Sequence, residues 1–261
     1  MKKLPLVGFV GLLASWLAGS VLAAPAAQVF DAVKMPESSD APWRARLCAL
    51  LPQPCTLERL ELYRPRGAAP GEHVLLSAQP LAMARVRRTA GADGWQLDRL
   101  HDFSAYAQAL AKEGSGGTPD VHVSLAPALY PLAEGRWAVA VQQTVTEGYS
   151  GGGASFSTAD FVPLEGGAAV HTGVPFSCNK MVRACFSEKE YRTSKHCHDE
   201  SFGSLRIAYG EPTKPGGPYD WQYTWLQTEW PQNEPKSATT TSRIRFTAKT
   251  IERAGFCGGP Q

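Results

Sequence analysis

The sequence has no excess of charge of one sign and no long apolar run beyond residue 24. Its formal net charge is +2 at pH 7, and Lys2 and Lys3 account for this excess, so the rest of the chain is close to neutral. Nucleic-acid binding depends on clustered Lys and Arg, so we expect no nucleic-acid partner. A membrane helix needs about 20 consecutive apolar residues, so we expect no membrane span after residue 24.

Complete cofactor and catalytic motifs are also lacking. The glycine-rich residues 148–153 have no Gly-Lys followed by Ser or Thr, which a phosphate-binding loop requires. The sequence therefore predicts no cofactor.

Residues 1–23 have the composition of a cleavable export signal. Lys2 and Lys3 precede an uncharged segment, and Val21-Leu22-Ala23 is a small-residue cleavage site. An uncleaved anchor is the alternative, but glycine and serine dilute the apolar segment and no Lys or Arg follows until Lys34. We expect cleavage before Ala24 and a periplasmic or secreted protein.

Six cysteines follow the predicted signal, and an even number in an exported chain indicates three disulfides. Cys48 and Cys55 stand apart from the others and are expected to pair. The pairing among the remaining four stays open; these are Cys178, Cys185, Cys197 and Cys257.

The pattern along the chain predicts an α+β fold, mostly antiparallel sheet, with two short helices in the N-terminal half. The first helix is expected at 42–51 and the second from Asp102 or Ser104 to Gly114. Residues 113–120 are the best candidate linker. We therefore expect an N-terminal α+β lobe at 24–114 and a β-rich lobe at 115–261, which can share one core.

Alternating apolar residues predict most of the strands. Residues 175–202, which hold three cysteines, are expected to be less regular. The predicted strands cover 57–63, 73–87, 137–145, 205–209 and 244–248.

Gly148-Tyr149-Ser150-Gly151-Gly152 matches the G-x-S-x-G pattern that places a serine nucleophile between a strand and a helix. The residues after Ser150 favour a strand, however, and consecutive glycines are typical of a hairpin turn. We therefore expect a hairpin and no catalytic residue here.

His196-Cys197-His198 is the densest group of potential metal ligands. On an extended backbone both histidines face the same way, but two ligands fall short of the three or four usual for zinc. Glu200 follows too soon for a cupin-like site. We expect Cys197 in a disulfide and no metal, with His196 and His198 as weak candidates.

Tyr219, Trp221, Tyr223 and Trp225 alternate strictly, which places four rings on one face of a strand. These rings can form a core face, the interpretation that we favour, or an exposed surface that binds a ligand.

Two functional classes remain. The favoured one is an exported, non-catalytic binding module for a protein or a cell-wall glycan, with the four aromatic residues as its candidate site. The alternative is a small exported hydrolase that uses Ser150 or a metal at His196 and His198.

Overall fold

The computed structural model describes residues 25–34, 42–90, 94–113, 121–248, 250 and 256–259. The predicted export signal and most of the predicted linker lie outside these residues. Within them, the structure has twelve strands and three short α-helices. The helices are α1 (Pro42–Cys48), α2 (Ser104–Glu113) and α3 (Glu188–Thr193), and 3-10 turns occur at η1 (Leu57–Arg59), η2 (Lys236–Ala238) and η4 (Phe256–Gly258).

The strands form one open antiparallel sheet in the order β12-β11-β10-β9-β8-β7-β6-β1-β2-β3-β4-β5. Strand β1 lies between β2 and β6, and all other neighbours follow one another in the chain. The predicted dominance of antiparallel sheet is confirmed. The strands are β1 (Gln28–Ala32), β2 (Leu60–Pro65), β3 (Glu72–Ala78), β4 (Leu81–Arg88), β5 (Trp95–Asp102), β6 (Val121–Ala133), β7 (Arg136–Tyr149), β8 (Gly152–Pro163), β9 (His171–Arg183), β10 (His198–Gly210), β11 (Asp220–Trp230) and β12 (Thr240–Phe246).

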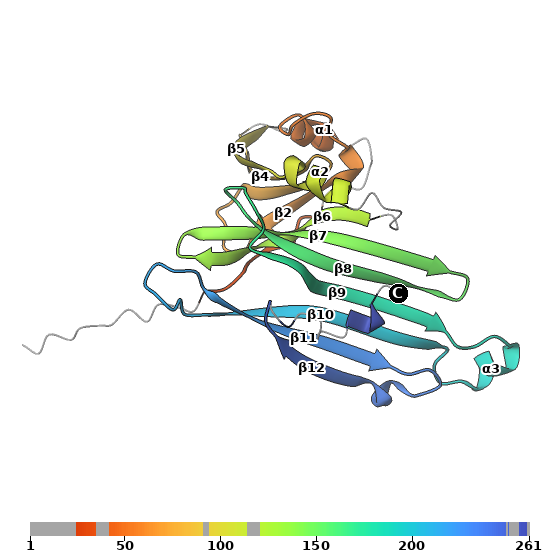
Figure 1. Ribbon diagram of the computed structural model, residues 1–261. Helices are drawn as coiled ribbons and strands as arrows, with labels where there is room; N and C mark the ends of the chain where they lie inside the picture. The colour runs from red at the N-terminus through yellow and green to blue at the C-terminus, as the bar shows by residue number, and fades with distance from the viewer. Residues whose placement is uncertain are drawn as a thin grey trace, which may run out of the picture.

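Figure 1 shows α1 and α2 beside the N-terminal strands, while β6–β12 fan out below them. Helix α3 projects beyond the ends of β9 and β10. Although β3 and β4 are not neighbours of β6 in the sheet, both contact it. The N-terminal strands therefore fold back over the middle of the sheet.

Buried apolar side chains form three clusters on the two faces of this sheet. One lies between α1 and β2–β4. A central core combines residues such as Met83 with Val139 and Val141, and thus draws on both predicted lobes. On the opposite face of β7, Ala138 and Ala140 belong to an aromatic core that extends to β11 and β12. The division into two lobes remains a prediction.

Three sequence expectations need correction. Residues 175–202, which were expected to be less regular, contain the second half of β9, helix α3 and the start of β10. The helices are not confined to the N-terminal half, because α3 lies between β9 and β10. It is short and carries no buried residue, but Ser187 and Glu190 form a capping box that satisfies its first backbone N–H groups. The strand expected at 73–87 is a hairpin that turns at Gln79-Pro80, since proline has no N–H group with which to continue a central strand.

All six cysteines form disulfides, as expected. Cys48 pairs with Cys55, Cys178 with Cys257, and Cys185 with Cys197. The bond from Cys178 in β9 holds η4 against the aromatic core. The bond between Cys185 and Cys197 closes the segment that contains α3.

Candidate functional site

Ser150 lies at the tip of the hairpin that joins β7 to β8. Ser150 and Gly151 form the turn, and Tyr149 pairs with Gly152 across it. The chain continues as strand β8 rather than as the helix that follows a nucleophile elbow. This geometry gives the serine-hydrolase alternative no support, and the lack of a catalytic residue stays a prediction.

The alternating aromatic residues lie on the face of β11 that meets the aromatic core. Trp221, Tyr223 and Trp225 are 6%, 1% and 0% exposed, respectively. Tyr219 precedes the strand and is partly buried against the same core. The burial agrees with the favoured core interpretation. Ligand binding by these four residues stays a prediction, with little exposed ring surface to support it.

Trp221 also links two strands that are not neighbours in the sheet. Its Nε1 donates a hydrogen bond to the carbonyl oxygen of Pro131 in β6, over 3.0 Å. The Trp221 ring centroid lies 4.9 Å from that of His171. Burial lowers the pKa of His171, because water no longer stabilises its charged form. Trp221 therefore holds β11 against β6, which is a structural role.

The structure brings a third potential ligand to His196 and His198. A nitrogen of each ring and a carboxylate oxygen of Glu200 all lie within 4.8 Å of one another. Nε2 of His196 is 3.4 Å from Oε1 of Glu200, and these side chains are only 9% and 17% exposed. Zinc sites that leave one coordination position open to water have three protein ligands, and two histidines with one glutamate are a known combination. These residues could hold a metal ion.

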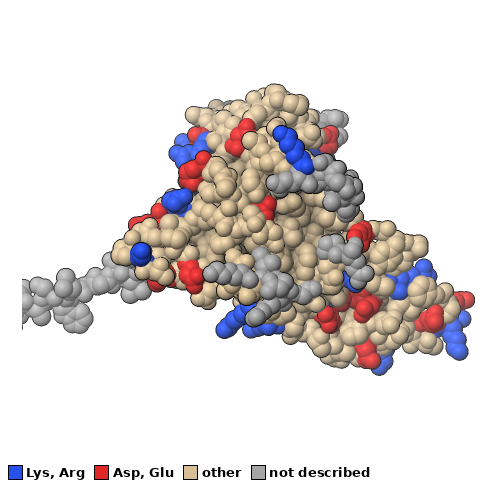
Figure 2. Space-filling model, viewed as in Figure 1, with Lys and Arg blue, Asp and Glu red and all other residues tan. Residues whose placement is uncertain are grey.

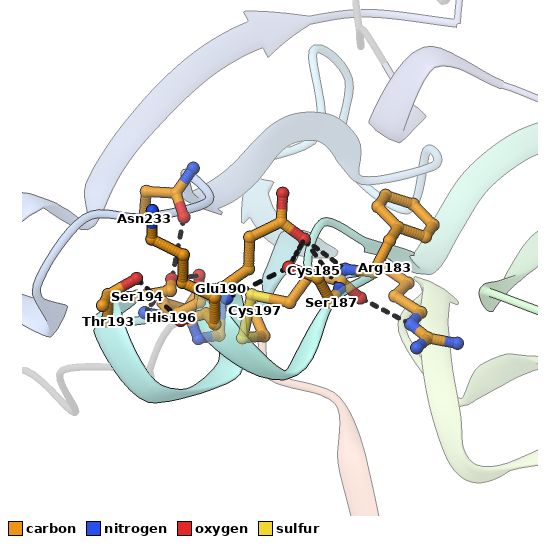
Figure 3. The surroundings of a disulfide bond; sticks show 11 residues. Arg183, Cys185, Ser187, Glu190, Thr193, Ser194, His196, Cys197 and Asn233 are labelled. Carbon is orange, nitrogen blue, oxygen red and sulfur yellow. Dashed lines mark hydrogen bonds between the residues drawn. A yellow bond between two sulfur atoms is a disulfide. The ribbon is translucent and has the colours of Figure 1, made fainter.

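His196 is fixed on several sides although it lies outside β10. Its ring stacks on Trp230 with 3.5 Å between the centroids and 2° between the planes. Its carbonyl oxygen accepts hydrogen bonds from the backbone N–H of Asn233 and from Oγ of Ser194. Figure 3 shows His196 next to the disulfide between Cys185 and Cys197. The disulfide and the stacked ring thus position this histidine.

Glu200 is the residue of this cluster that the sequence interpretation rejected as a ligand, because its spacing did not fit a cupin-like site. His198 and Glu200 are two residues apart in β10, so both side chains lie on one face of the strand. The two-residue spacing of His198 and Glu200 was visible in the sequence. The position of the His196 ring could not be read from the sequence, because it depends on the disulfide and on Trp230.

Exposed apolar side chains lie on this face of the sheet and on the segment that contains α3, and we call them the apolar patch: Met181 and Phe202 on the strands, and Phe186 and Tyr191 on the α3 segment. Met181 and Arg183 alternate on β9 and so share one face. The guanidinium group of Arg183 lies 5.4 Å from the ring centroid of Phe186 and 5.6 Å from that of Tyr191. Arg183 therefore connects the strand to α3.

A groove of about 430 Å³ runs along this face, and Glu200, Met181 and Phe202 line it. Its floor includes Gly148 and Gly153, which pair across β7 and β8. A Cβ atom on Gly148 would meet no atom within 4 Å, so the space above it is open. The groove thus joins the apolar patch to the possible metal ligands.

Figure 2 shows Lys, Arg, Asp and Glu intermixed at the end of the molecule that carries α3.

Comparisons with protein-family profiles, curated proteins and solved structures found no match. Among the residues that the structure describes, no helix is both long and apolar enough to cross a membrane. Function is therefore inferred from local geometry.

Proposed function

We propose that the protein is an exported, non-catalytic binding module whose ligand is a polypeptide segment bound along the groove and the apolar patch. The main observation is a group of exposed apolar side chains, with Met181 and Phe202 on one face of the sheet and Phe186 and Tyr191 on the neighbouring α3 segment. Contiguous exposed apolar side chains on a folded protein are typical of interaction sites. The opposite face of these strands is buried in the aromatic core.

Export is supported by the three disulfides, because such bonds persist in oxidising compartments. The charged, apolar and small-residue segments of residues 1–23 fit the same proposal. A periplasmic and a secreted location are both compatible with these features.

A polypeptide ligand agrees with the chemistry of the face better than a glycan does. Protein interfaces are enriched in aromatic residues, Met and Arg. The apolar patch contains aromatic residues and Met181, and Arg183 lies against two of its rings, Phe186 and Tyr191. The groove adds polar partners for a backbone, since Ser155 and Asn179 also line it. The open space above Gly148 can accept one apolar side chain.

A photo-crosslinking amino acid at position 202 tests this proposal. Position 170 is the control, because Val170 is 46% exposed and Phe202 is 42% exposed, but Val170 lies outside the groove. In cells that export the protein, we expect polypeptide adducts from position 202 that position 170 does not give. Gly148→Val should strongly reduce them, since the added side chain would occupy the part of the groove above position 148.

The captured segment, made as a synthetic peptide, should bind the wild-type protein and bind Gly148→Val at least about tenfold more weakly, a difference of about 1.4 kcal/mol. Equal binding to both proteins would contradict the proposal. Co-sedimentation with peptidoglycan that is lost in Phe202→Ala would instead identify a glycan ligand.

A further inference from the structure

We propose that His196, His198 and Glu200 bind a divalent first-row transition metal ion, for which Zn²⁺ is the probe. Their ligand atoms lie within 4.8 Å of one another. The site is separate from the apolar patch in its chemistry and does not depend on the polypeptide-binding proposal. It also differs from the sequence expectation, which counted the two histidines and rejected Glu200 on its spacing.

The donor set fits an ion of the zinc type. Two imidazoles and one carboxylate are a frequent combination in sites that leave a coordination position open. Imidazole favours Zn, Cu, Ni and Fe over Mg or Ca. Both nearby cysteines are joined in a disulfide, so the site offers nitrogen and oxygen ligands and no thiolate.

The distances are close to those that a metal ion requires. Ligands at about 2.1 Å from a tetrahedral zinc ion are roughly 3.4 Å from one another. Nε2 of His196 and Oε1 of Glu200 are already 3.4 Å apart. His198 lies on the same face of β10 as Glu200, and its ligand nitrogen lies within 4.8 Å of the other two ligand atoms.

A simple ion pair between His196 and Glu200 leaves two features unexplained. Nε2 of His196 is buried and has no hydrogen-bond partner among the described residues, because its contact with Glu200 lacks hydrogen-bond geometry. Buried polar atoms normally have a partner. The ion pair also gives no role to His198, whose ring centroid lies 5.8 Å from that of His196. A metal ion would satisfy all three side chains.

The charges around the site permit a cation. Arg183 is opposite His198 in the register of β9 and β10, but its Nε donates a hydrogen bond to the carbonyl oxygen of Cys185 over 2.7 Å. Its guanidinium group lies against the rings of Phe186 and Tyr191. Arg183 is thus held by neighbours other than the proposed ligands.

Zn²⁺ titration by calorimetry tests the site. The full chain is produced in an oxidising compartment, purified without a histidine tag, and freed of metal by a chelator. We expect about one Zn²⁺ per chain with a Kd in the micromolar range or below. His198→Ala should weaken binding at least about 100-fold and Glu200→Gln at least about tenfold, as expected for loss of groups that hold or orient a metal.

The matched control is His122→Ala, which removes an exposed histidine that contacts Arg59 and should leave the Kd unchanged. Thermal melting of each variant without metal shows whether it folds, and neither His198→Ala nor Glu200→Gln removes the stacked His196 ring. Visible absorption of bound Co²⁺, lost in both variants, is a second readout. The proposal is overturned by an absence of saturable binding below about 100 μM, by unchanged affinity in both variants, or by equal weakening in His122→Ala.

Discussion

Gly203 lies directly against the indole ring of Trp225. A Cβ atom on Gly203 would be 2.1 Å from Cζ2 of Trp225 and 2.5 Å from Sγ of Cys178. The missing side chain therefore allows the Trp225 ring and the Cys178–Cys257 disulfide to pack in one layer of the aromatic core.

Gly203→Ala should lower the free energy of unfolding by about 1–3 kcal/mol, because overpacking of a filled core displaces its neighbours. Urea denaturation measures this change. Gly210→Ala is the control in the same strand, where the new Cβ atom would lie 3.4 Å from its nearest neighbour, Cβ of Asp220. An equal loss in both variants would show that crowding of Trp225 is not the cause.

The disulfide that closes the longest loop should stabilise the protein more than the disulfide that closes the shortest loop. Cys178 and Cys257 are 79 residues apart, whereas Cys48 and Cys55 are 7 apart. A longer closed loop restricts the unfolded chain more, and the chain-entropy relation gives a difference of about 2 kcal/mol. Paired Cys→Ser variants, compared by urea denaturation, should show the larger loss for Cys178 and Cys257. A larger loss for the short loop would contradict this expectation.

Local patterns in the sequence predicted much of the fold. Alternation at residues 137–145 indicated what proves to be β7. The helix expected from Asp102 or Ser104 begins at Ser104 and ends at Glu113, next to Gly114 in the sequence. Spacing alone also indicated the Cys48–Cys55 disulfide. Each of these features depends on residues that are close together in the chain.

Long-range features could not be predicted in the same way. The insertion of β1 between β2 and β6 has no local signal, and neither does the pairing of Cys178 with Cys257. Helix α3 carries no buried residue, and the sequence interpretation did not use its one local signal, the Ser187 and Glu190 capping box. The contact of His196 with Glu200 depends on the disulfide of Cys197, and the sequence left open which cysteine Cys197 pairs with.

Trp221→Ala and Trp225→Ala should each destabilise the protein by about 3–5 kcal/mol, because each removes a large buried side chain. Thermal melting should show a fall of many degrees in both. Phe186→Ala is the control, since Phe186 is 72% exposed and its truncation should leave the melting temperature nearly unchanged. Unchanged melting of both tryptophan variants would favour the exposed binding surface instead.

His171 should make the protein less stable in acid. Burial lowers the pKa of His171 below its ordinary value of 6.5, so the unfolded chain binds this proton more readily than the folded chain does. Stability rises with pH wherever the unfolded state binds more protons. The contribution of His171 is therefore fully present above the unfolded-state pKa of about 6.5 and is lost as the pH falls from there through the lower pKa of the folded state.

His171→Phe tests this dependence, because a phenyl ring can keep the contacts with Trp221 and Tyr223 and does not titrate. The free energy of unfolding is measured at pH 7.5 and pH 5.5 by urea denaturation. Wild type should lose more stability between these values than His171→Phe does, while the exposed-site variant His122→Gln should follow wild type. Parallel profiles for wild type and His171→Phe would show that protonation of His171 does not limit folding in acid. If His171→Phe instead loses more stability than wild type between pH 7.5 and pH 5.5, protonation of His171 stabilises the folded state, which is the opposite of the expected effect.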